Sequence, residues 1–331
     1  MHERTGVFRF MSLILAAGLI AGPGRAFAQP ANDYHLFGTV KDTRGNPIPG
    51  ARIVLREKGG WKEHVITTDK NGKYDRWFIP HGIYETRIEK PGYRTLTFEW
   101  DLSGYRDEPI PVERHFVLVS EEEIRQQERA QQAQKDADAA VQAFNQGDCS
   151  TATAKSRAVL EFDPQYYVSY LILARCAVRE KKWDEAIAHY QKTLSIKADI
   201  PEAHFDLAVL YVEKQDWANA LTEFQKALEL KPDFVEALDQ MARIYYNQKQ
   251  WDKCIEAVDR ILTQKSDYAW AYRLGGYAWA QKGDLAKAAD YFKKYLELNP
   301  NAEDRKVAED VIRAGAAKKP TGGTSKKPSL Y

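Results

Sequence analysis

A repeat of 34 residues fills the second half of this chain and limits what it can fold into. Small residues recur at this step from Ala140 onward, and leucines recur at the same step from Leu160 onward. The two series are Ala140, Ala174, Ala208, Ala242 and Gly276, and Leu160, Leu194, Leu228, Leu262 and Leu296. Self-similarity at a fixed period of this length is the signature of stacked repeat units. The sequence therefore predicts five units, at 133–166, 167–200, 201–234, 235–268 and 269–302.

Each unit has the pattern of two antiparallel helices joined by a turn. Small residues such as Ala208 and Ala220 let the two helices approach closely, and larger apolar residues fill the space between them. A single hairpin leaves one apolar face open, which the next hairpin covers. Residues 303–316 carry an apolar stripe that includes Val307 and Val311, so they are expected to cap the array. The second half should therefore be an α-solenoid of five helical hairpins plus a capping helix.

Residues 33–119 have a different pattern, in which short strands are separated by turns. Apolar Leu36 and Val40 alternate with polar Thr39 and Lys41, as in a strand with one buried face. About seven such runs follow one another, separated by clusters of Gly, Pro, Asn and Asp. This spacing is typical of a small β-sandwich. The fold class expected for the whole chain is therefore multidomain, with a seven-stranded sandwich followed by the solenoid.

Ser120 begins a helical segment between the two domains. Its side chain is expected to cap the helix, and Glu123 would complete a capping box. The segment is rich in strong helix formers and continues to about Asn145, just before Gly147. Residues 120–132 should therefore form a helical connector that is stiffer than a Gly/Ser linker.

Both domains resemble known families. The array resembles tetratricopeptide repeats, and unit 201–234 fits that consensus best, with His204 in place of the consensus tryptophan. Residues 33–119 resemble the carboxypeptidase regulatory-like domain, a transthyretin-like sandwich. The matching residues are Gly38-Thr39-Val40, Asp42, Gly45, Pro47, Pro49-Gly50-Ala51, Thr68-Asp69, Gly72, Tyr74, Phe78, Pro80, Gly82, Tyr84 and Gly92-Tyr93. The resemblance implies an accessory, non-catalytic sandwich and an array whose first helices line a concave groove.

The groove residues can be chosen by their spacing. Leu173, Ala174 and Ala177 should face the hairpin partner, so Arg175 belongs to a different stripe of the first helix. The stripes of successive repeats give the predicted partner site: Arg175, Phe205, Val209, Arg243, Tyr246, Asn247, Arg273 and Tyr277. Tyrosine and arginine often anchor interfaces, and arginines favour an acidic or carboxylate-ended peptide. The alternative is that this stripe packs on the neighbouring first helices.

The cysteines and tryptophans carry three further expectations. Cys149 and Cys176 are expected to pair in a disulfide if the compartment is oxidising, with three unpaired core cysteines as the alternative. Trp61, Trp77 and Trp100 could stack on sugar rings if they are exposed, which makes the sandwich a possible glycan-binding module. The tryptophans of the repeats are assigned to the core. These are Trp183, Trp217 and Trp251.

The two ends of the chain predict export and a disordered tail. Arg4 and Arg9 precede about 12 apolar residues, and Ala26-Phe27-Ala28 offers the small residues that a signal peptidase requires. Residues 1–28 should be a signal peptide cleaved after Ala28, with an uncleaved anchor as the alternative. No later segment is apolar enough to span a membrane, so the mature chain should be secreted or periplasmic. The tail at 317–331 is basic and contains Gly and Pro, so it should be disordered.

The remaining patterns argue against several function classes. The net charge of +1 gives no nucleic-acid footprint, and the sequence contains no HExxH, GxSxG, Walker or CxxC motif. We therefore expect no catalytic residue and no cofactor. Four histidines lie in the sandwich, but a metal site needs three or four converging ligands, so none is predicted. These histidines are His35, His64, His81 and His115.

The leading functional hypothesis is a non-enzymatic scaffold or adaptor that binds a protein or peptide through the array. A carbohydrate-binding or envelope-associated module acting through the sandwich is the alternative. A third hypothesis, an accessory subunit of an enzyme whose catalytic chain is separate, is neither supported nor excluded by the sequence.

Overall fold

The computed structural model describes residues 33–104 and 110–317, which form two units divided after Gln131. The predicted signal peptide at 1–28 lies outside the described residues, as does the predicted disordered tail beyond residue 317. Within the described ranges, no helix combines the length and the apolar character that crossing a membrane requires.

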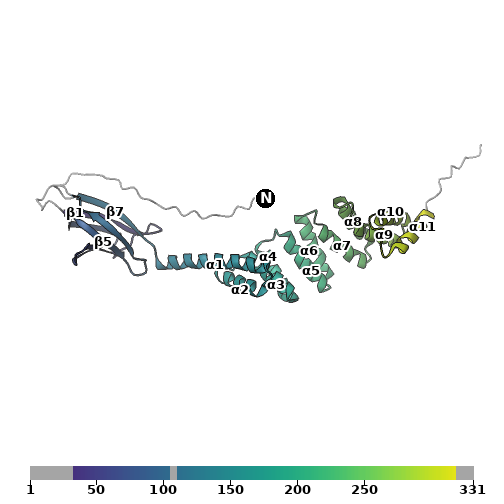
Figure 1. The fold of residues 1–331 in the computed structure, drawn as a ribbon, viewed down its shortest axis with the longest axis horizontal. Helices are drawn as coiled ribbons and strands as arrows, with labels where there is room; N and C mark the ends of the chain where they lie inside the picture. Colours follow the sequence, from purple (N-terminus) through teal and green to yellow (C-terminus); the bar gives the residue numbers. More distant parts are fainter. Residues whose placement is uncertain (1–32, 105–109, 318–331) are drawn as a thin grey trace, which may run out of the picture. The chain divides into compact units, whose positions relative to one another are not determined.

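Seven strands in two sheets make up the first unit, which confirms the predicted sandwich (Figure 1). The three-stranded sheet has the order β4-β1-β7, and the four-stranded sheet has the order β3-β2-β5-β6. The strands are β1 (Asp33–Asp42), β2 (Arg52–Glu57), β3 (Glu63–Thr67), β4 (Lys73–Pro80), β5 (Gly82–Glu89), β6 (Leu96–Leu102) and β7 (Ile110–Leu118). β1 pairs antiparallel with β4 and parallel with β7, so the first and last strands are neighbours.

The core of the sandwich follows from the alternation of side chains along the strands. Alternate residues of β1, such as Leu36 and Val40, are buried, and they meet inward-facing residues of the other sheet such as Ile53 and Ile88. Trp100 is 4% exposed and belongs to this core. It therefore has no exposed ring face to offer a sugar.

The helix α1 (Glu121–Asn145) has the bounds that the sequence predicted. The hydroxyl of Ser120 accepts a hydrogen bond from the backbone N–H of Glu123 at 3.1 Å, as an N-cap should. The second half of the predicted capping box does not form. The Glu123 carboxylate instead accepts a hydrogen bond from the Thr43 hydroxyl at 2.8 Å, so it ties the start of the helix to the first turn of the sandwich.

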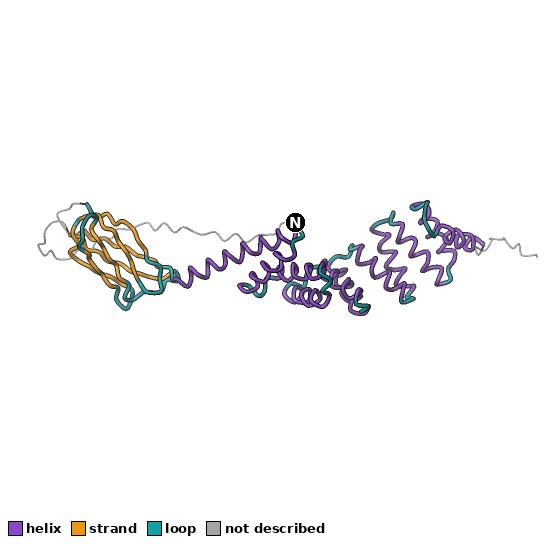
Figure 2. The backbone as a smooth tube through the Cα atoms, turned by 60° about the horizontal axis from the view of Figure 1, so that its bottom comes forward, coloured by secondary structure: helices purple, strands orange, loops and turns teal. Residues whose placement is uncertain are grey.

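Antiparallel helices in series build the second unit, which confirms the predicted solenoid (Figure 2). The later half of α1 contacts α2 through a cluster that includes Ala140 and Ala152. Each following hairpin pairs an odd-numbered helix with the next even-numbered one. The helices are α2 (Cys149–Phe162), α3 (Tyr167–Arg179), α4 (Trp183–Ile196), α5 (Pro201–Glu213), α6 (Trp217–Leu230), α7 (Val235–Asn247), α8 (Trp251–Gln264), α9 (Ala269–Lys282), α10 (Leu285–Leu298) and α11 (Arg305–Ala317). α11 packs on α10 through buried Ala308, together with Val311 and Ile312.

The turn inside each hairpin contains a residue with positive φ, and this residue also recurs at the 34-residue step. It is glycine in the first and last hairpins, where φ is 85° at Gly147 and 89° at Gly283. In the three middle hairpins it is Lys181, Gln215 or Lys249, with φ between 58° and 60°. A left-handed residue commonly ends a helix, but a residue with a Cβ is strained there.

The repeated tryptophans are less buried than the sequence analysis expected. Trp217 is 37% exposed, and Trp183 and Trp251 are partly buried. Each is the first residue of the second helix of its hairpin. A side chain in this first turn covers the edge of the hairpin, whereas the small residues one turn later fill the interior, namely Ala186, Ala220 and Cys254.

Candidate functional site

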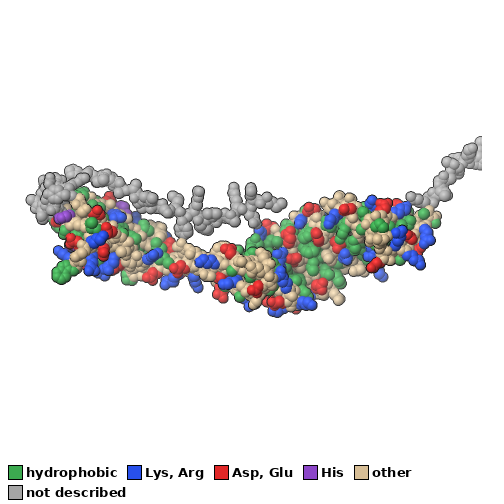
Figure 3. Space-filling model, in the orientation of Figure 1, with side chains coloured by type: hydrophobic (Ala, Val, Ile, Leu, Met, Phe, Trp, Pro, Cys, Tyr) green, Lys and Arg blue, Asp and Glu red, His purple; other side chains and the backbone are tan. Residues whose placement is uncertain are grey.

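The predicted groove residues lie on the first helices of four successive hairpins, namely α3, α5, α7 and α9. Leu173, Ala174 and Ala177 are buried, and the two alanines belong to one cluster with Ala186 and Tyr190 of the hairpin partner α4. Most of the groove residues are partly buried, and only Arg243 and Asn247 among them are exposed. On the face shown in Figure 3, hydrophobic side chains gather over the part of the array labelled α5 to α7 in Figure 1.

The N-terminal arginine of the row is held by the next hairpin. Nε of Arg175 lies 3.3 Å from Oδ2 of Asp206 on α5, and the Tyr190 hydroxyl donates to the same oxygen at 2.9 Å. Burial raises the pKa of Asp206 even though both partners favour its charged form. The charge of Arg175 is thus largely neutralised within the array, and its side chain ties α3 to α5.

The C-terminal arginine is held in a similar way by the start of the cap. Nε of Arg273 donates to Asp304 at 2.6 Å, and the hydroxyls of Tyr277 and Tyr295 donate to the same carboxylate at 2.8 Å each. Burial alone would raise the pKa of Asp304, but these three hydrogen bonds outweigh it and lower the pKa to about 2. Arg273 and Tyr277 therefore fasten the cap to the last hairpin.

The apolar residues of the row pack against neighbouring helices. The Phe205 ring lies 4.9 Å from the Phe234 ring and 5.6 Å from the Phe224 ring, measured between centroids. Val209 joins the same cluster. Phe205 is therefore packed within the array, against the second helix of its own hairpin and against the residue that precedes α7.

The centre of the row differs from both ends. Nε of Arg243 donates to Oδ2 of Asp239 at 2.9 Å, and its guanidinium lies 4.0 Å from the centroid of the Trp270 ring on α9. Asp239 is only 9% exposed, and its other oxygen, Oδ1, is buried without a hydrogen-bond partner among the described residues. Burial is also the main reason why the pKa of Asp239 is raised. A buried acceptor without a donor is costly, so Asp239 holds polar capacity that its described neighbours do not use.

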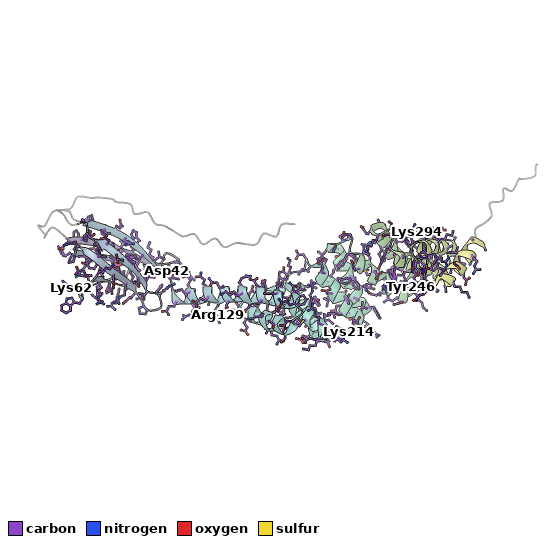
Figure 4. All side chains as sticks on the ribbon, in the orientation of Figure 1. Asp42, Lys62, Arg129, Lys214, Tyr246 and Lys294 are labelled. Carbon is purple, nitrogen blue, oxygen red and sulfur yellow. The ribbon has the colours of Figure 1, made fainter. Side chains whose placement is uncertain are left out.

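Two further predicted residues flank this centre. Tyr246, labelled in Figure 4, packs edge-on against Trp251 with 5.2 Å between centroids. Asn247 is the last residue of α7 and is exposed. We name the central site by its residues, Asp239, Arg243, Tyr246, Asn247 and Trp270, and refer to it as the α7 site.

Sequence reasoning missed the residues that neutralise the outer arginines. Asp206 follows Arg175 by 31 residues, and Asp304 follows Arg273 by the same number. This separation is one repeat less about one helical turn. It places Asp206 on the next first helix and Asp304 immediately before α11, each close to its arginine. A search for opposite charges at this spacing would have found both pairs. No comparable spacing in the sequence identifies Trp270, because its contact with Arg243 depends on the side-chain rotamers.

Cys149 and Cys176 are thiols in this structure, so their pairing stays a prediction. The two side chains do face each other. The pKa of Cys176 is raised to about 12, mainly by burial and secondly by a hydrogen bond with Cys149. Cys254 is fully buried on α8, and burial raises its pKa to about 12 as well.

The histidines of the sandwich contact different partners and do not gather at one site. His115 Nδ1 lies 3.0 Å from the Thr39 hydroxyl, and His35 Nε2 lies 3.2 Å from Asp75. Among residues 33–104 and 110–317, no group of three or more His, Cys, Asp or Glu is placed to hold a metal ion.

Comparisons with known families cover both units. The carboxypeptidase regulatory-like domain profile matches residues 35–119. Tetratricopeptide repeat profiles match residues 178–215, 210–249 and 241–313. The chain is a tetratricopeptide repeat protein with an N-terminal carboxypeptidase regulatory-like domain. Apart from Trp270, the α7 site thus lies on the first helix of one tetratricopeptide hairpin. No curated protein matches this sequence.

Solved tetratricopeptide structures are similar to the repeat array at low sequence identity. A crystal structure of MamA is 24% identical, covers 54% of this chain and 96% of its own, and has a TM-score of 0.48. YrrB, described as a tetratricopeptide protein with an unusual peptide-binding site, is 21% identical, covers 52% of this chain and 88% of its own, and has a TM-score of 0.47. A repeat protein from Parabacteroides merdae is 19% identical, covers 56% and 76%, and also has a TM-score of 0.47.

Proposed function

We propose that this protein is a non-enzymatic adaptor that binds a peptide or protein segment at the α7 site. The observation that carries the proposal is the contrast along the arginine row. All three arginines bind an aspartate through Nε. At the centre, however, Arg243 is the exposed one, and among the described residues Asp239 lacks the tyrosine donors that Asp206 and Asp304 have. This is the point of the row where polar capacity is left for a ligand.

The chemistry of the α7 site favours an acidic segment of peptide. Arg243 uses Nε for Asp239, so its terminal N–H groups are left to bind a carboxylate. The stacked Trp270 ring fixes the plane of the guanidinium before a ligand arrives. The exposed side chain of Asn247 could pair with a peptide group in both directions. An acidic side chain or a C-terminal carboxylate is therefore the expected anchor.

A peptide library displayed with free C-termini tests the ligand class. Panning against the full chain should enrich acidic residues or one C-terminal sequence. The same panning against the Asp239→Asn/Arg243→Gln double variant, which removes both charges but keeps similar shapes, should not. Enrichment of the same peptides by both proteins would move the binding function away from the α7 site.

We also propose that the protein acts outside the cytoplasm. The proposal rests on the sequence of residues 1–28, where a positively charged start and a short apolar run precede Ala26-Phe27-Ala28. The mature chain should begin at Gln29. Mass spectrometry of the protein from an envelope or secreted fraction checks this, and an intact N-terminus carrying residues 1–28 would contradict it.

A further inference from the structure

A β-bulge on β4 places two aromatic side chains at the surface of the sandwich. Tyr34 pairs with Ile79 and Leu36 pairs with Arg76, so Trp77 and Phe78 together oppose the single residue His35. Phe78 has a φ of 63°, which is strained for an aromatic residue, and its side chain is 50% exposed. Hydrophobic burial does not explain why a phenylalanine stands at this position. Strain of this kind often marks a functional site.

The neighbouring Trp77 is held in a fixed orientation. Its ring stacks on His35 with centroids 3.6 Å apart and planes at 9°, and His35 stacks in turn on Phe37 at 4.9 Å. His35 also lies 3.2 Å from the carboxylate of Asp75. Trp77 remains 49% exposed although one face is covered, so the other face of the ring is available. An aromatic surface ordered in advance reduces the entropy lost on binding.

Beside these aromatic residues lies a cavity of about 660 Å³ between the edge strands of the two sheets. Residues 62–65 line one side and residues 75–78 line the other. Lys62, labelled in Figure 4, lies at the end of the sandwich opposite Ser120, because the β2–β3 turn and the β4–β5 turn share that end.

Two acids and two cations line the cavity, and only the acids have hydrogen-bond or ion-pair partners among the described residues. Its two acids are occupied, since Asp75 lies beside His35 and Glu63 lies 3.4 Å from Arg87. Its two cations, Lys62 and Arg76, form no hydrogen bond or ion pair with any residue that the structure describes. Both also lie near enough to His64 to repel a proton. The pKa of His64 is lowered, mainly because the ring is partly buried and secondly because Lys62 and Arg76 are positively charged.

We propose that this cavity is a binding site for an acidic saccharide, separate from the α7 site. The apolar face of one sugar ring stacks on Trp77 and contacts Phe78, because the electron-rich face of an aromatic ring attracts C–H groups. The carboxylate of the sugar pairs with Arg76 and Lys62. Hydroxyl groups bind His64, which can accept or donate a hydrogen bond while it is neutral. The cavity therefore combines a fixed aromatic face with two unpaired cations.

The test is calorimetric titration of the full chain with uronic-acid tetrasaccharides, tetragalacturonate and tetramannuronate. Maltotetraose serves as the neutral control. At least one acidic probe should bind at least tenfold more tightly than maltotetraose. Trp77→Ala and Lys62→Gln/Arg76→Gln should each weaken that binding at least tenfold. Trp61→Ala should leave it unchanged, because Trp61 is 93% exposed and does not line the cavity.

Phe78→Gly separates a binding role from a structural one. Glycine accepts the left-handed backbone without strain, so this variant should melt at a temperature at least as high as the parent chain. It should nevertheless bind the acidic probe more weakly. Absence of binding to both acidic probes, or binding that survives the Trp77 and Arg76 substitutions, would overturn the proposal. So would a preference for a polyglutamate peptide, or for phosphatidylglycerol vesicles in a manner that depends on Trp61.

Discussion

Asp304 has the most strongly perturbed carboxylate in the array, and three donors are the reason. Arg273, Tyr277 and Tyr295 all donate to it, and together they hold its pKa at about 2, below the ordinary value of 3.8. The side chain is 15% exposed, so solvent screens these contacts only in part. At the scale of single residues, this cluster fastens the capping helix, and the α7 site differs from it mainly in lacking such a closed set of partners.

Replacing Asp304 by asparagine should lower stability in a manner that depends on pH. A depressed folded-state pKa stabilises the folded chain above the unfolded pKa, and this contribution is lost as pH falls toward the folded pKa. The variant should therefore be less stable by about 1–2 kcal/mol at pH 7. The difference should shrink between pH 4 and pH 2. Urea unfolding of both chains across this range measures it, and a difference that does not change with pH would contradict the assigned pKa.

The cysteines give a second prediction at this scale. If the protein is exported, thiol titration of the oxidised chain under denaturing conditions should find one thiol, Cys254, because Cys149 and Cys176 have paired. The enclosed loop of 26 residues should then add about 3 kcal/mol of stability relative to the reduced chain. A count of three thiols after oxidation would rule out the pairing. In the folded chain, Cys254 should resist alkylation, because burial raises its pKa to about 12.

At the scale of elements, the turn inside each hairpin shows where stability can be gained. The backbone is left-handed at five equivalent positions, but only Gly147 and Gly283 suit it. At the middle positions, such as Gln215, a residue with a Cβ has a strained positive φ, and the helices on both sides of the turn hold it in that conformation.

Gln215→Gly should stabilise the array by about 0.5–1 kcal/mol, since it removes the clash of Cβ in the left-handed region. Gly283→Ala should destabilise it by a similar amount for the same reason. Gln215→Ala is the matched control and should change stability little, because it keeps the Cβ. Thermal melts of the three variants check the prediction. A Gln215→Gly variant no more stable than Gln215→Ala would argue against strain at this turn.

Local patterns in the sequence were sufficient to predict the elements but not how distant ones pair. The 34-residue period gave the helices of the array, because each hairpin repeats the same contacts with its neighbours. The alternation around Leu36 and Val40 gave β1 but not its parallel pairing with β7 or the bulge at Trp77 and Phe78. Those features depend on contacts between segments far apart in the chain. The same limit applies to Arg175 and Arg273, whose neutralising partners lie 31 residues away.

At the scale of the whole molecule, each unit contributes a separate surface. The sandwich offers an aromatic and cationic cavity, and the repeat array offers the α7 site. Neither surface depends on a residue of the other unit, so each should bind its ligand independently of the other. Substitutions at Trp77 should leave peptide binding unchanged, and substitutions at Arg243 should leave saccharide binding unchanged.

Calorimetry with the best peptide from the library measures whether the α7 site holds the peptide partner. Truncating Arg243 alone would leave Asp239 buried without its cation, so Asp239→Asn/Arg243→Gln is the better variant. Arg260→Gln, on the second helix of the same hairpin, is the matched control. We expect the double variant to lose about 2 kcal/mol of binding, roughly 30-fold in affinity, while the control keeps full affinity and both fold normally. Equal affinity of the double variant and the parent chain would mean that the peptide binds elsewhere.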